Sequence, residues 1–375
     1  MPMQLSKAIY FSQEDISEIN TNLSKSLQSG QLTLGPFGSL FEKEFCKLVH
    51  TQYGVAVNSG TSSLEILLRI LDVKDKEVIV PTDTFFATPA AVIHAGGIVR
   101  FADVDRNTFS LSLETIKKQL NKNTVAVIIV HIAGIISPEI NKIVDFCKKN
   151  KLFLIEDAAH AHGSHLNGIY AGNFGNAASF SFYPTKVITS AEGGIIVTND
   201  KKIYDESIMY RDQGKIDFKR NYCVRMGYNW RMSEPHAIIG LTQLKHINEY
   251  IKNRQMIAQI YNEGISHIPE LEKLILPKGS KPNFYKYIAI LKPTISRDQL
   301  KNFLREQFKF SLPGEVYELP CHLQPIFAPY NKEPLPEAEY ICKQHICLPI
   351  SGVMKAEEAY FVIDSLKVAL KAISL

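Results

Sequence analysis

Short apolar runs alternate with segments of helical periodicity along the first half of the chain. The apolar runs predict buried strands at 55–58, 77–81, 97–102, 124–130 and 152–155. Apolar residues three or four positions apart predict helices at 39–50, 64–70, 88–95, 113–120 and 138–149. This alternation is typical of an α/β fold in which helices cover both faces of a parallel sheet.

The pattern changes toward the C-terminus. A long helix is predicted from Glu234 to about Tyr261, starting after Ser233, a residue type that favours helix N-caps. A strand at 285–291 and helices at 297–307 and 356–373 follow. Because 375 residues exceed the usual size of one hydrophobic core, we expect a large domain at 1–250 and a smaller C-terminal domain at 251–375.

Composition narrows the class of protein. Apolar residues make up 45% and charged residues 21% of the chain, and the net charge of +4 comes from scattered basic residues. We therefore expect no nucleic-acid or membrane partner and instead a small-molecule ligand. The six cysteines show no C-x-x-C pair and no histidine spacing that suggests zinc, so we expect no metal and reduced thiols in the cytoplasm.

Chemically useful side chains follow the predicted strands. In open parallel sheets, ligands bind beyond the carboxyl ends of the strands. The residues at these positions are Ser59-Gly60-Thr61, Thr84-Phe85, His131, Asp157 with His160, and a loop from Ser181 to Gly194 that holds Lys186.

The turn at Ser59-Gly60-Thr61 leads from a strand into a helix. Free backbone N–H groups, a hydroxyl and the positive end of the helix dipole suit a phosphate there. Simple N-capping by Thr61 or Ser62 would explain the same residues without a ligand. The turn alone leaves both readings open.

Lys186 lies between two apolar runs, on a loop between two expected core strands. A lysine buried among apolar neighbours loses hydration, its pKa falls, and the free amine becomes a nucleophile. The simpler alternative is an exposed loop lysine. Taken together, however, the lysine, the carboxylate of Asp157, an aromatic ring and a phosphate turn meet the needs of pyridoxal 5′-phosphate. No G-x-G-x-x-G motif follows the first strand to indicate a dinucleotide site instead.

With these motifs, the sequence resembles the sugar aminotransferases of the DegT/DnrJ/EryC1/StrS family along nearly its whole length. The motifs that carry the resemblance are Gly35-Pro36, Asn58-Ser-Gly-Thr61, Val80-Pro81 with Thr84-Phe85, Glu156-Asp-Ala-Ala-His-Ala-His-Gly163, the lysine loop, Gly227-Tyr-Asn-Trp-Arg-Met-Ser233, Tyr317-Glu-Leu-Pro-Cys-His322 and Leu348-Pro349. The resemblance implies a fold-type-I transferase with a mostly parallel seven-stranded sheet and a small C-terminal α+β domain.

The resemblance also implies roles for individual residues. Lys186 would bind pyridoxal phosphate covalently, Asp157 would pair with its ring nitrogen, and Phe85 would stack on the ring. Gly60, Thr61 and Ser181 would hold the phosphate, and His160 stands where most members have Gln beside the phenolic oxygen. Candidate substrate ligands are Tyr183, His131, Arg231 and His322.

The implied reaction moves an amino group, from glutamate in our expectation, to a keto group of a nucleotide-linked deoxy sugar for surface polysaccharide or antibiotic sugar synthesis. Two alternatives are a sugar dehydrase of the same family and a cofactor-binding regulatory relative without turnover. The dehydrases carry histidine in place of the lysine, so Lys186 disfavours the first. Intact Lys186 and Asp157 disfavour the second.

Asn229 follows a polar stretch that begins at Tyr210 and departs from the strand–helix alternation; we call this segment the excursion. The resemblance implies that Asn229 reaches the phosphate site of a neighbouring subunit, so that a two-fold homodimer shares its active sites. The alternative is that Asn229 and Arg231 cap the helix starting near Ser233.

Overall fold

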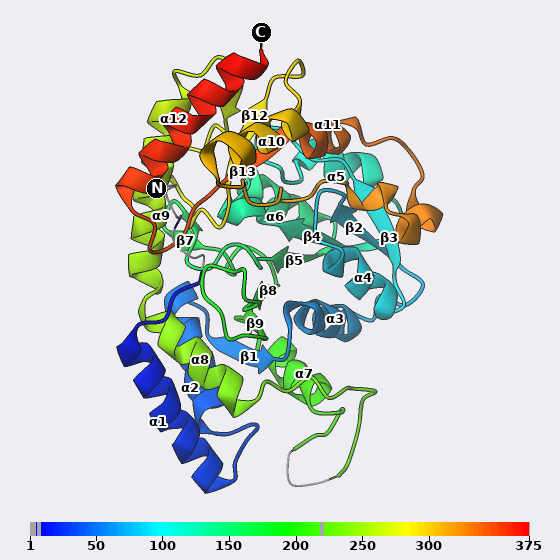
Figure 1. The fold of residues 1–375 in the computed structure, drawn as a ribbon. Helices are drawn as coiled ribbons and strands as arrows, with labels where there is room; N and C mark the ends of the chain where they lie inside the picture. Colours follow the sequence, from blue (N-terminus) through cyan, green and yellow to red (C-terminus); the bar gives the residue numbers. More distant parts are fainter. Residues whose placement is uncertain (1–4, 6–8, 218–220, 375) are drawn as a thin grey trace.

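The computed structural model describes residues 5, 9–217 and 221–374. Its centre is a seven-stranded sheet in the order β1-β9-β8-β5-β4-β2-β3 (Figure 1). β9 is antiparallel to β1 and β8, and the remaining pairs are parallel, which confirms the predicted mostly parallel sheet. The strands are Tyr53–Val57 (β1), Glu77–Pro81 (β2), Ile98–Ala102 (β3), Thr124–Val130 (β4), Phe153–Asp157 (β5), Ala177–Ser181 (β8) and Gly194–Thr198 (β9).

Helices cover both faces of this sheet. In β4, Val127 and Ile129 pack with α2 and α6, while Ala126 and Ile128 pack with α3 and α4 on the other face. Burial of alternate residues on opposite faces explains why the strands read as continuous apolar runs. The helices of this part are Gln13–Ser29 (α1), Pro36–Val49 (α2), Gly60–Leu71 (α3), Ala87–His94 (α4), Leu113–Gln119 (α5), Ile140–Lys149 (α6) and Lys201–Arg211 (α7).

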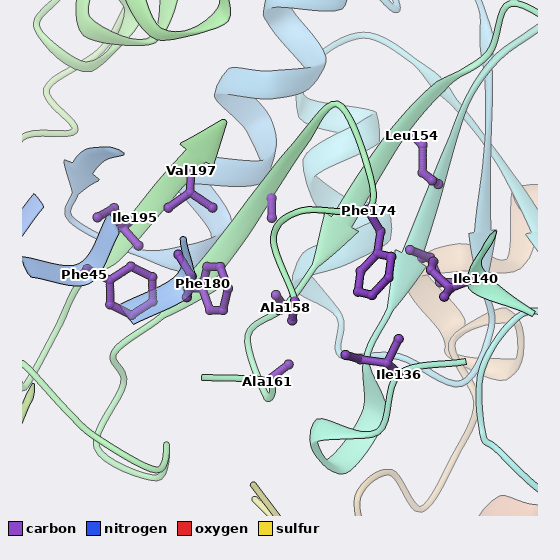
Figure 2. Packing of buried hydrophobic residues seen from close by; sticks show 14 of the residues in the cluster. Phe45, Ile136, Ile140, Leu154, Ala158, Ala161, Phe174, Phe180, Ile195 and Val197 are labelled. Carbon is purple, nitrogen blue, oxygen red and sulfur yellow. The ribbon is translucent and has the colours of Figure 1, made fainter. Parts of the chain in front are cut away.

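Aromatic packing fixes α2 on the sheet. Phe45 of α2 meets Phe180 of β8 edge-on, with ring centroids 4.9 Å apart. Figure 2 shows these two rings beside Ile195 and Val197 of the neighbouring strand β9. The cluster continues past Ala158, on the loop that leaves the end of β5.

The C-terminal part builds a second core around an antiparallel sheet in the order β10-β12-β13. In Figure 1, α9 runs along the side of the molecule from α8 to this sheet, and α12 packs beside α9. The proposed boundary at 250/251 falls inside α9, so that division stays a prediction. The elements are Glu234–Lys245 (α8), Ile247–Ile265 (α9), Leu271–Lys273 (β10), Tyr287–Leu291 (β12), Arg297–Phe308 (α10), Pro336–Gln344 (α11), His345–Leu348 (β13) and Ala356–Ile373 (α12).

A short third sheet joins the two parts. It contains His165–Leu166 (β6), Ile169–Tyr170 (β7) and Ser280–Lys281 (β11), with β6 between the other two strands. Three 3-10 turns lie at Ile132–Gly134, Cys321–Leu323 and Pro325–Tyr330. Within the described ranges, no helix is long and apolar enough to cross a membrane.

Two sequence predictions of helix boundaries were wrong. The predicted helix from Glu234 to Tyr261 is two helices that meet at His246. The helix predicted at 39–50 begins at Pro36, so the segment 35–38 contains the first turn of α2. Gly35 is the N-cap, and the buried carboxylate of Glu234 accepts hydrogen bonds from the N–H groups of Gly35, Phe37 and Gly38 at 3.1, 2.8 and 2.9 Å.

Candidate active site

A cavity of about 450 Å³ lies at the carboxyl ends of β5 and β8, large enough for a cofactor-sized ligand. It unites most of the predicted site residues, which come from separate strand ends. Those that line it are Gly60, Thr61, Phe85, Asp157, His160, Ser181, Tyr183 and Lys186. The ring of Phe85 is 60% exposed, so an apolar face is available at this cavity.

Lys186 lies largely buried on the loop between β8 and β9. Its Nζ is 4.9 Å from the centre of the Tyr285 ring. Burial lowers the pKa of Lys186 to about 8; attraction to Asp157 opposes this shift and repulsion from Lys286 adds to it. The interpretation of Lys186 as an exposed loop lysine was therefore wrong, and its neutral amine is accessible near neutral pH.

Asp157 ends β5 and is held by two hydrogen bonds. Thr88 Oγ1 donates to Asp157 Oδ2 at 2.7 Å, and the backbone N–H of Ala159 donates to Oδ1 at 3.2 Å. The Thr88 hydroxyl has a single hydrogen, so its 2.8 Å contact with Thr84 is a bond that Thr84 donates. Burial raises the pKa of Asp157, and the Thr88 bond and the charge of Lys186 oppose that rise.

The predicted phosphate turn opens α3. Its N-cap is Ser59, whose side chain accepts from the N–H of Ser62 at 3.1 Å, so the interpretation that Thr61 or Ser62 caps the helix was wrong. Within the described residues, the Thr61 hydroxyl makes no hydrogen bond, and Thr61 lines the cavity. A Cβ on Gly60 would lie 2.9 Å from Ser181 Cβ, so glycine permits this close approach of the turn to β8. The turn thus presents donors that fit a phosphate.

His160 packs against Tyr285 with ring centroids 4.2 Å apart. Its buried Nδ1 has no hydrogen-bond partner within the described chain, and burial holds its pKa well below the usual range. The amide of Asn283 donates to the carbonyls of His160 and His162 at 2.9 and 3.0 Å, which fixes this loop to the segment before β12 that holds Tyr285. His160 thus lines the cavity as a neutral imidazole, which fits a ligand oxygen there.

Four predicted residues lie outside the cavity lining. His131 is fully buried and its Nε2 lies 2.9 Å from Glu156 Oε2. His322 is also buried, with Nδ1 2.7 Å from Thr82 Oγ1. Both histidines therefore have contacts that hold neighbouring segments in place.

Arg231 and Asn229 lie on the excursion before α8. Arg231 forms an ion pair with Asp212, and Asn229 is exposed and makes a backbone bridge to Asp212. Ser233 caps α8, with its side chain accepting from the N–H of His236. The interpretation of Asn229 and Arg231 as caps of that helix was therefore wrong.

Sequence analysis missed several residues that complete the cavity wall. Thr88 could have been found, because it lies one helical turn after Thr84 at a strand end that had been singled out. The others are Tyr285, Lys286, Glu315 and Tyr317, which come from the C-terminal part of the chain.

A lysine and a carboxylate that meet at the carboxyl edge of this sheet, beside a helix N-terminus, fit pyridoxal phosphate. Fold and site together define a pyridoxal-phosphate-dependent aminotransferase of fold type I. The chain belongs to the DegT/DnrJ/EryC1/StrS aminotransferase family, whose sequence profile matches residues 13–367.

Individual relatives support this assignment. The chain is 34% identical over 338 residues to GDP-perosamine synthase of Escherichia coli O157:H7, covering 88% of this chain and 90% of the relative. It is 31% identical to UDP-N-acetyl-3-dehydro-alpha-D-glucosamine 3-aminotransferase of Acidithiobacillus ferrooxidans, covering 91% and 90%. The crystal structure of S. venezuelae DesV with a ketimine intermediate superimposes with a TM-score of 0.89 at 28% identity, covering 95% of each chain.

Proposed function

We propose that this protein transfers an amino group from glutamate to the keto carbon of a nucleotide-linked deoxy sugar, for surface polysaccharide or antibiotic sugar synthesis. The observation that carries the proposal is the placement of Lys186 and Asp157 in one cavity beside the α3 turn. The names of the relatives support a nucleotide-sugar acceptor, since one acts on a GDP sugar and another on a UDP sugar. The six cysteines are free, as is typical of cytoplasmic proteins, the location we propose.

Pyridoxal phosphate, when bound, supplies an aldehyde that holds amino groups and a ring that accepts electrons from the substrate. Lys186 would hold it covalently, and as a free amine Lys186 could accept a proton from the donor's Cα. Asp157, with its buried, hydrogen-bonded carboxylate, would keep the ring nitrogen protonated.

The other cavity residues bind and orient. Gly60, Thr61 and Ser181 would hold the phosphate, Phe85 would cover the ring, and His160 would contact the phenolic oxygen. Tyr183, which is 49% exposed at the cavity, contacts the acceptor sugar.

We further propose a homodimer in which Asn229 completes the partner's phosphate site. Asn229 is exposed and does not line its own cavity, and large apolar side chains among the described residues of the same excursion are also exposed. Met226 is 84% exposed, and Ile216, Tyr222 and Tyr228 are about half exposed or more. A second subunit would bury this surface.

The experiment is a screen of GDP-linked and UDP-linked 3-keto and 4-keto sugars with ¹⁵N-glutamate, read by mass spectrometry. We expect one acceptor to gain the labelled amino group and Lys186→Ala to form no product. Loss of an oxygen from the sugar without gain of nitrogen would instead identify a dehydrase. No change in any sugar, with the cofactor bound, would favour the regulatory alternative.

A further inference from the structure

A second lysine, Lys286, lines the cavity together with Lys186. Lys286 stands immediately before β12, and its half-buried side chain reaches the cavity beside Glu315 and Tyr317. Its Nζ lies 6.0 Å from the centre of the Tyr285 ring, the same ring that Lys186 contacts at 4.9 Å. Two ammonium groups therefore gather around one aromatic side chain.

Lys286 has no carboxylate partner within the described residues. Its Nζ donates to the carbonyl of Gly314 at 3.0 Å, a neutral acceptor that leaves two of its three hydrogens free. Glu315, an acid in the same lining, is already paired with Lys301 at 2.6 Å. The positive charge of Lys286 is thus left available to a ligand.

Few positively charged side chains line the cavity to bind an anionic substrate. Apart from Lys186, Lys286 is the only lysine or arginine among the described residues that line it. Once Lys186 is bound to the cofactor, Lys286 is the cation that remains for a carboxylate of the donor or the diphosphate of the acceptor. Either group carries negative charge that an ammonium stabilises.

We propose that Lys286 is the anion-binding residue of this cavity, and that an anion bound to it controls the charge on Lys186. The inference deepens the proposed function and rests on it. Without an anion, the charge of Lys286 disfavours a second positive charge on the Lys186 nitrogen. A bound carboxylate or phosphate cancels that repulsion, so substrate binding favours protonation of the nitrogen.

The size of this charge effect follows from the distances of the two lysine nitrogens to the centre of the Tyr285 ring. The two ammonium nitrogens are less than about 11 Å apart, which corresponds to a shift of about one pH unit at an effective dielectric constant of about 20. The other titratable groups facing Lys186 across the cavity are Asp157, His160, Glu192, Tyr183, Tyr285, Glu315 and Tyr317. They are unchanged when Lys286 is replaced, so the difference between variants isolates its charge.

The test is a pH titration of the absorption spectrum of the cofactor-loaded protein. Lys286→Met and Lys286→Gln remove the charge, while Lys286→Arg keeps it and serves as the matched control. The midpoint of this titration reports protonation of the Lys186 nitrogen. We expect the midpoint to rise by about one pH unit in Lys286→Met and Lys286→Gln, and to stay near the wild-type value in Lys286→Arg.

The anion is tested with GDP, UDP and glutarate, none of which carries an amino group that could react. We expect at least one of them to raise the wild-type midpoint and to leave the Lys286→Met midpoint unmoved. A shift with glutarate alone assigns the site to the donor's carboxylate, and a shift with the nucleotides alone assigns it to the diphosphate.

Two results would overturn the proposal. One is a Lys286→Met midpoint equal to that of the wild type. The other is a shift by anions that is as large in Lys286→Met as in the wild type. A wild-type protein that shows no cofactor absorption at all would overturn the proposed function itself, which separates the two failures.

Discussion

Replacing Asp157 by Asn separates its charge from its hydrogen bonds. The amide oxygen can still accept from the N–H of Ala159, and the amide N–H₂ can donate to Thr88. The Thr88 hydroxyl would then donate to Thr84, reversing the chain that now runs from Thr84 through Thr88 to Asp157. Because both partners of Asp157 keep a hydrogen bond to residue 157 and only the hydroxyl hydrogen of Thr84 loses its acceptor, we expect the free energy of unfolding to fall by no more than about 1–2 kcal/mol.

The lost charge has a larger effect on catalysis. A neutral amide does not hold the ring nitrogen protonated as negative charge develops, so we expect kcat to fall by about 10²–10³-fold, within the range for removal of one electrostatic stabiliser. The cofactor stays bound, because Lys186 and the α3 turn are unchanged. The pKa of Lys186, now about 8, falls further without the attraction of Asp157.

Asp83→Asn is the matched control. Asp83 is fully buried near the end of β2, outside the cavity lining, and burial raises its pKa to about 7. The assay is stopped-flow absorbance of the half-reaction with glutamate, alongside urea unfolding of both variants. The reasoning fails if Asp157→Asn retains kcat within tenfold of wild type, or if Asp83→Asn loses as much.

Three further predictions concern stability, titration and assembly. Glu234→Gln should lower the free energy of unfolding in urea by about 2–4 kcal/mol, because one amide oxygen then replaces a carboxylate that accepts from three backbone N–H groups. Glu249→Gln, at an exposed position, should change the free energy of unfolding by less than about 0.5 kcal/mol. Equal effects of the two substitutions would contradict this prediction. The rate at which the cofactor-free protein captures pyridoxal phosphate should rise with pH through about 8, as Lys186 loses its proton, and then level off; a rise centred near pH 10.5 would show an unshifted lysine. Inactive Lys186→Ala and Asn229→Ala dimers, unfolded and refolded together, should regain about a quarter of wild-type activity, because half the dimers are hybrids with one intact site. Activity no higher than that of the parents, with hybrids confirmed by mass, would exclude a shared site.

The sequence predicted the sheet and half of the cavity because both depend on local patterns. Continuous apolar runs mark strands buried on both faces, and parallel strands end at one edge, so Lys186 and Asp157 could be placed together without coordinates. Similarity to a family motif alone was a poorer guide to which residues line the cavity. His322 lies in a matching motif, yet its ring contacts Thr82 and lies outside the cavity lining.

The other half of the cavity depends on contacts between distant segments. Tyr285 and Lys286 precede a strand of the separate antiparallel sheet, and no local pattern says that this sheet faces the end of β5. The Glu234 cap on α2 joins residues about 200 positions apart, so the sequence near Gly35 reads as a turn. The break at His246 was missed because neither glycine nor proline stands at the junction of α8 and α9.

The central claim is that Lys186 holds the cofactor, and reduction tests it most directly. Borohydride converts the reversible bond between a lysine and pyridoxal phosphate into a stable amine, which peptide mass spectrometry locates. The account predicts a yellow protein that bleaches on reduction and carries the label on Lys186, with no labelled peptide from Lys186→Ala. A label on Lys286 or any other lysine of the wild-type protein would contradict it.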